Sequence, residues 1–150
     1  MRLSYPALFY YDDRESVKYF VTFPDFKNSA TQGDNITDAM YMASDWLGIN
    51  LADLIENGEE TPQQSNINRL SLADNNPFKN DPDFTLTYDP AKSFISMVTV
   101  DLSDYLNNDH PIKKTLTIPT WADKLGHELN LNFSQTLTEA IAEYKIDQKH

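Results

Sequence analysis

Near the end of the chain, a short alternating segment carries side chains that could recognise another molecule through hydrogen bonds. In KKTLTIP, residues 113–119, Leu116 and Ile118 face one side of an extended strand, because side chains alternate along a strand. The opposite face carries a polar set, Lys113, Thr115 and Thr117. No second strand follows in the sequence, and a lone exposed strand leaves its backbone donors and acceptors unpaired. A second copy of the chain, pairing antiparallel about a two-fold axis, is the economical partner, so we expect a homodimer.

Two helices are predicted directly after this segment. Pro119 suits the first turn of a helix, where its missing N–H costs nothing. The helix that it opens has apolar residues four apart on one face, Trp121, Leu125 and Leu129. Asn132 and Gln135 have the N-cap and capping-box spacing that starts a second helix. That helix is expected to bury one apolar face, made of Phe133, Leu137, Ala140, Ile141 and Tyr144.

The order of strand, helix and helix over residues 112–146 resembles the ribbon–helix–helix DNA-binding fold of bacterial repressors. A two-stranded ribbon fits the major groove of DNA. By this resemblance, the base edges there would be read by Lys113, Thr115 and Thr117. Lys114 would contact a phosphate. The start of the second helix has free backbone N–H groups at Asn132, Phe133 and Ser134 and carries the positive end of the helix dipole. Both features suit the binding of a DNA phosphate. The alternative is a dimerisation module with no DNA target.

The charge of the chain is unevenly distributed. Residues 1–110 hold 7 Lys/Arg and 18 Asp/Glu, a net charge of −11, whereas residues 111–150 hold 5 of each and are neutral. An acidic surface repels nucleic acid and attracts basic proteins, raising their rate of encounter. The distribution therefore favours a basic protein partner for the first part, although acidity can also serve solubility alone.

The first part of the chain is predicted to form an α+β layer, an antiparallel sheet with a packed helix. Two β-rich runs, residues 7–11 and 17–26, flank a polar turn and predict a hairpin. Asn35 is placed to cap a helix with apolar residues at 3.6-residue spacing. Gly48 is expected to interrupt that helix, and a second helical segment is expected to end at Gly58.

The rest of the chain suggests two domains. Residues 59–92 are rich in Pro, Asn and Asp and are interpreted as a long surface loop, followed by an apolar strand at 93–101 that returns to the sheet. We expect one domain over residues 1–106, a linker at 107–111 and the helical module at 112–150.

Composition excludes several classes of site. The chain has no cysteine, which excludes disulfides, thiolate nucleophiles and zinc ribbons and favours a reducing compartment. No apolar run reaches the roughly 18 residues of a membrane span, so a cytoplasmic location is expected. The histidines, His110, His127 and His150, have no spacing typical of metal ligands. We expect no metal, no cofactor and no catalytic residue.

The first part of the chain carries a series of short motifs in a characteristic order. These are Phe23-Pro24-Asp25, Thr31-Gln32-Gly33-Asp34, Asp38-Ala39 and Pro62-Gln63-Gln64-Ser65. Together with the C-terminal module, they resemble the HicB antitoxin family over most of residues 5–72. The chain departs from the family at Lys27-Asn28-Ser29, where Pro-Gly-Cys is usual, so the turn there is expected to differ.

The resemblance implies a partial ribonuclease-H-like sheet that has lost nuclease activity. It also implies a HicA-type partner, a small basic toxin that cuts mRNA with a histidine, and repression of the chain's own operon through operator DNA. An acidic body would cover the cationic face of such a toxin. The candidate contacts are acidic residues expected to cluster at strand ends: Asp12, Asp13, Glu15 and Asp25. A second acidic patch is the alternative: Asp53, Glu56, Glu59 and Glu60.

Two other functions fit parts of the sequence. A stand-alone repressor would share the C-terminal module and use the first domain to sense a small molecule. A nuclease could hold two metal ions between carboxylates at strand ends, drawn from Asp12, Asp13, Asp25 and Asp38. We disfavour the nuclease because no carboxylate lies in the middle of an apolar strand and Asp12-Asp13 is typical of a turn.

Overall fold

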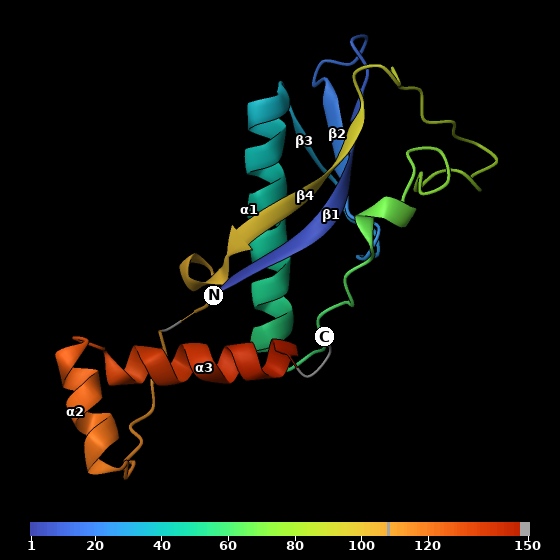
Figure 1. Cartoon of the computed structure of the whole chain (residues 1–150). Helices are drawn as coiled ribbons and strands as arrows, with labels where there is room; N and C mark the ends of the chain where they lie inside the picture. Colours follow the sequence, from blue (N-terminus) through green and yellow to red (C-terminus); the bar gives the residue numbers. More distant parts are fainter. Residues whose placement is uncertain (108, 148–150) are drawn as a thin grey trace.

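Alternating apolar residues in the first part of the chain build one antiparallel sheet, with strand order β3-β2-β1-β4 (Figure 1). The computed structural model describes residues 1–107 and 109–147. The strands are β1 (Arg2–Tyr11), β2 (Tyr19–Thr22), β3 (Thr31–Gly33) and β4 (Phe94–Asp101). Phe9 of β1 lies opposite Val21 on one side and Phe94 on the other. The predicted hairpin and returning strand are confirmed, whereas β3, with three residues, was not predicted.

Helix α1 (Ile36–Glu56) covers one face of this sheet. Its N-cap is confirmed, since the Asn35 side chain accepts a hydrogen bond from the Asp38 N–H at 2.9 Å. The buried core joins apolar residues of the strands to one face of the helix, among them Tyr5, Ala7, Phe9, Val21, Ala39, Ala43, Leu47 and Leu51. Hydrophobic burial between the two layers therefore fixes the body of the protein.

The predicted break at Gly48 is wrong, because α1 continues through it to Glu56. Gly48 instead makes room for the ring of Tyr105: a Cβ at this position would lie 2.5 Å from a carbon of that ring. The Tyr105 hydroxyl also donates to Asp45 on α1 at 3.0 Å. The helix ends where predicted, with Gly58 in the left-handed region at φ +70°.

Residues 59–92 form a second cover over the opposite face of the sheet. Pro6, Leu8 and Tyr10 on that face are fully buried, although they lie outside the core that faces α1. The Tyr10 hydroxyl donates to the carbonyl of Leu72 at 2.7 Å, and its ring meets Tyr88 edge to face at 4.9 Å. Figure 1 shows this segment beside the sheet, on the side away from α1, with only one short 3-10 turn, η1 (Ile67–Arg69). The long loop is thus a layer of the body.

The C-terminal module has two helices, α2 (Thr120–Glu128) and α3 (Phe133–Asp147), preceded by a 3-10 turn, η2 (Leu102–Asp104). The Asn132 side chain caps α3 by accepting from the Gln135 N–H at 3.1 Å. The reciprocal half of the predicted capping box is absent, because the Gln135 amide donates to Glu139 instead. Asn130 adopts φ +53° between the helices, a conformation that asparagine tolerates better than most residues.

The predicted burial on α3 does not occur in the single chain. The residues of the predicted face, Phe133, Leu137, Ala140, Ile141 and Tyr144, are exposed. The buried residues of α3 are Ala142 and Ile146, and Ile146 joins the core of the body. Figure 1 shows the C-terminal turns of α3 near the C-terminal end of α1, where Ile146 packs on the core. Helix α3 therefore has two apolar faces, of which one contacts the body and the other is exposed.

No helix in residues 1–107 or 109–147 is long and apolar enough to cross a membrane.

Candidate functional site

The polar segment before α2 is fully exposed in the single chain. Residues 111–119 have no regular secondary structure, and all of them are exposed, including Lys113, Lys114, Thr115 and Thr117. Leu116 and Ile118, predicted to share one side of a strand, are 57% and 45% exposed. The single chain therefore does not form the predicted strand, and the pairing of two copies stays a prediction.

The start of α3 keeps two backbone donors open. The Asn132 side chain accepts a hydrogen bond from the Gln135 N–H. The N–H groups of Phe133 and Ser134 make no hydrogen bond within the described part of the chain. The Phe133 side chain has a structural role, because its ring fills the space above Gly126, where a Cβ would lie 2.4 Å away. The backbone at 133–134, rather than the Phe133 ring, is thus suited to an anion.

The C-terminal module exposes many large apolar side chains. Its members are all at least 37% exposed: Ile112, Leu116, Ile118, Trp121, Leu125, Leu129, Leu131, Phe133, Leu137, Ile141 and Tyr144. Apolar surface of this extent marks an interaction site in a folded protein. We call these residues the apolar face of the module.

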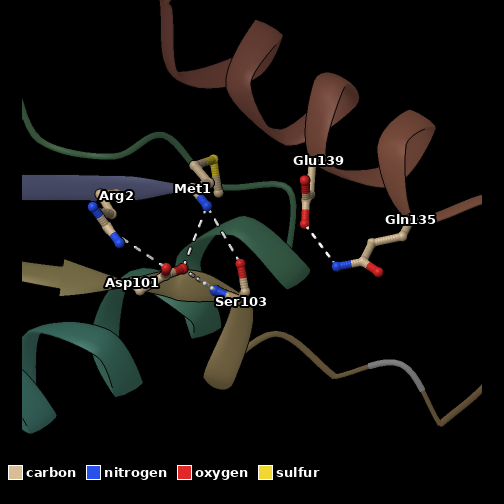
Figure 2. A network of polar contacts seen from close by, with 6 residues as sticks. All are labelled: Met1, Arg2, Asp101, Ser103, Gln135 and Glu139. Carbon is tan, nitrogen blue, oxygen red and sulfur yellow. Dashed lines mark hydrogen bonds and ion pairs between the residues drawn. The ribbon is translucent and has the colours of Figure 1, made fainter. Parts of the chain in front are cut away.

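A polar network fixes the end of β4, close to the module (Figure 2). The amino group of Met1 donates to Asp101 and to the Ser103 hydroxyl, each at 3.3 Å. Hydrogen bonds from Ser103, together with the nearby amino group, lower the pKa of Asp101 to about 2. Gln135 and Glu139 pair on the adjacent helix α3 (Figure 2). The network therefore anchors the point from which the chain leaves the body.

The acidic residues predicted to cluster lie beyond opposite ends of β2: three in the hairpin turn and Asp25 after the strand. Asp12 is already paired, because the Arg14 guanidinium donates to its two carboxylate oxygens at 3.0 and 2.9 Å and lowers its pKa. Asp13 and Glu15 are exposed in the same hairpin turn. Asp25 lies beyond the other end of β2, where its carboxylate accepts from the backbone N–H of Ser65 at 2.9 Å and from the Ser65 hydroxyl. Asp25 thus holds the 59–92 segment in place.

Beside the hairpin turn lies a groove that the sequence did not predict. It has a volume of about 370 Å³ and runs between residues 12–20 and the 59–92 segment. Its walls include Asp12, Glu15, Phe20, Phe78 and Phe84. The one available signal was PFKNDPDF, in which two phenylalanines stand in an otherwise polar stretch. We call it the aromatic groove.

The nuclease alternative gains no support from the positions of its carboxylates. Asp25 binds Ser65 and Asp38 accepts from the Asp34 N–H at 2.8 Å, so each has a local structural role. The described residues contain no group of three His, Asp or Glu side chains that could hold a metal ion. His127 contacts the carbonyl of Asp123 at 2.8 Å, and His150 lies outside the described residues.

Comparisons with known proteins identify the family. The model of the HicB-like antitoxins of bacterial toxin–antitoxin systems matches residues 4–72. A chain of a toxin–antitoxin complex from Streptococcus pneumoniae is 65% identical, with a TM-score of 0.71, over 97% of this chain and 100% of that one. The antitoxin HicB of Burkholderia pseudomallei shares the fold at 24% identity and a TM-score of 0.54, over 95% of this chain and 98% of that one. A comparison with curated proteins finds no match.

These matches agree with the order of motifs from Phe23 to Ser65 and with the sheet, helix and covering segment that those motifs build. With 65% identity to the pneumococcal relative over nearly the full length of this chain, the chain belongs to the HicB-like antitoxin family of bacterial toxin–antitoxin systems and is an antitoxin rather than an enzyme.

Proposed function

We propose that this antitoxin binds and neutralises a small, basic HicA-type toxin that cleaves mRNA, and that a dimer of it represses its own operon by binding operator DNA. The observation that carries the first part is the pneumococcal relative, which is 65% identical and forms part of a toxin–antitoxin complex. The charge distribution supports it, since residues 1–110 carry the whole net charge of −11. An acidic body and a basic toxin attract each other.

The toxin-binding role is tested by co-purification and RNA cleavage. We expect the small basic protein encoded next to this chain to co-purify with it and to cleave mRNA when alone. Adding this chain in equimolar amount should stop the cleavage. Undiminished cleavage would reject the antitoxin role proposed here, and the absence of any such neighbouring reading frame would favour the stand-alone repressor with a ligand-sensing first domain.

The DNA-binding role rests on the C-terminal module. Its apolar face gives two copies a surface to share, and pairing of two 113–118 segments would bury Leu116 and Ile118 while presenting the polar set on one side. The module is neutral overall, so it escapes the repulsion between the acidic body and DNA. We assign a ribbon–helix–helix module to residues 112–150, a ribonuclease-H-like toxin-binding domain to 1–106 and a linker to 107–111. Tyr105 and Leu106 pack on the core and so suit the end of the first domain.

Replacing the ribbon threonines is expected to reduce operator discrimination selectively. Thr115→Ala and Thr117→Ala each remove a candidate base contact, worth roughly 1–3 kcal/mol at most. Lys114→Ala is the matched control, because loss of a phosphate contact should weaken binding to all DNA alike. Fluorescence anisotropy with the operator and with random duplex of equal length, at two salt concentrations, measures both. If the threonine variants lose the same affinity for both duplexes, these residues do not read bases.

A further inference from the structure

We propose that the aromatic groove, beside the hairpin turn, receives an arginine side chain from the basic toxin and forms the centre of the toxin interface. The inference rests on the toxin-binding role proposed above and assigns that role to particular side chains. It moves the expected contact from acidic residues alone to an aromatic site with the Glu15 carboxylate at its rim.

The floor of the groove is a chain of aromatic rings held by the body. Phe84 meets Phe78 edge to face at 4.7 Å, and Phe78 contacts Phe20 of β2 at 6.0 Å. Phe20 stacks on Tyr10 at 6.3 Å, and Tyr10 is buried and bonded to the 59–92 segment. Phe84, at the open end, is 48% exposed. A large aromatic ring that is packed on one side and exposed on the other is typical of residues that dominate binding energy at interfaces.

The rim of the groove has one carboxylate available to a partner, that of Glu15. The charged side chains that line the groove are Asp12, Arg14, Glu15 and Lys18. The Arg14 charge is taken up by Asp12 in the two-point contact described above, and the Lys18 ammonium donates to the carbonyl of Asp13 at 3.2 Å. The Glu15 carboxylate forms no ion pair or hydrogen bond with another described residue. It is therefore open to a cation from outside.

Arginine fits this combination better than other side chains. Its planar guanidinium stacks on aromatic rings and is less strongly hydrated than an ammonium, and it bonds a carboxylate at two points. An arginine in the groove would stack its guanidinium on the Phe84 ring and donate hydrogen bonds from its N–H groups to the Glu15 carboxylate. Charge complementarity with a basic partner selects the toxin as the source.

The test compares variants of the groove with matched variants elsewhere, using the full-length antitoxin and the purified neighbouring basic protein in surface plasmon resonance. Phe84→Ala is expected to raise the Kd at least about tenfold, mainly through faster dissociation. Glu15→Gln should slow association and reduce its dependence on salt. The controls are Tyr41→Ala, an exposed aromatic on α1, and Glu143→Gln on α3, which should bind within twofold of the wild type.

Phe84→Leu separates an arginine from an apolar occupant. Leucine keeps apolar surface but has no ring to attract a guanidinium, so this variant should bind as weakly as Phe84→Ala. Wild-type binding by Phe84→Leu would overturn the arginine assignment, and wild-type binding by Phe84→Ala would overturn the groove altogether. Unchanged thermal unfolding of both variants shows that the loss is local. If the wild type itself does not bind, the toxin-binding role fails instead.

Discussion

Replacing Gly33 by alanine is expected to destabilise the body by about 3 kcal/mol, because the added methyl group has no room. A Cβ at Gly33 would lie 2.3 Å from the backbone nitrogen and 2.5 Å from the Cα of Ala39, in the first turn of α1. These are backbone atoms of a capped helix and cannot rotate away. The short connection from β3 to the N-cap Asn35 forces this approach, which explains the glycine in the Thr-x-Gly-Asp motif.

Urea unfolding followed by tryptophan fluorescence measures this effect. Trp46 stacks on Phe23 at 5.2 Å and reports on the body, and a Trp121→Phe background removes the signal of the module. Gly58→Ala is the control: Gly58 has φ +70° but nothing within 4 Å of an added Cβ, so only backbone strain of about 1 kcal/mol is expected. Equal losses in the two variants would show that close packing at Gly33 is not the cause.

Much of the body could be predicted from the sequence, because local signals there agree with the final packing. Apolar residues alternate from Val17 to Phe23 and predict a half-buried strand; Tyr19 and Val21 of β2, and Phe23 directly after it, are buried. The Asn35 cap is likewise a local interaction, formed with Asp38 three residues on. The order of short motifs was enough to suggest the family that the comparisons then showed.

Features that depend on distant parts of the chain could not be predicted. Gly48 has the local signature of a helix break, yet the ring of Tyr105, far along the chain, occupies the space beside it and the helix continues. The 59–92 segment lacks periodicity, since it is held by separate contacts such as those of Tyr10 with Leu72 and Tyr88. Nothing in its spacing shows that it covers a sheet.

Counting charges also could not tell which carboxylates are available to a partner. Asp12 and Asp25 cannot be told apart from the other acidic residues in the sequence. In the structure, the Asp12 carboxylate accepts a hydrogen bond from Arg14 and the Asp25 carboxylate accepts one from Ser65. Asp13 and Glu15, from the same predicted set, keep exposed side chains. The toxin contact that we propose therefore lies at the hairpin turn and the groove beside it.

The apolar face of the module leads to the second large expected effect. Ile118→Asp is expected to abolish dimerisation and to reduce operator affinity by at least about 100-fold, because pairing would bury two aspartates near a two-fold axis. In the single chain Ile118 is 45% exposed, so the substitution should leave the folded monomer intact. The acidic body does not include this residue, so toxin binding should persist.

Sedimentation equilibrium and anisotropy with the operator duplex measure the two losses together. Ile49→Asp makes the same change at a residue of α1 that is 55% exposed, and it should affect neither measurement. An Ile118→Asp protein that still dimerises at wild-type concentrations would contradict pairing through residues 113–118 and place the dimer contact on α2 and α3 alone. A monomer that still binds the operator with wild-type affinity would contradict the ribbon itself, because one unpaired segment leaves half of its backbone donors and acceptors without partners in the groove.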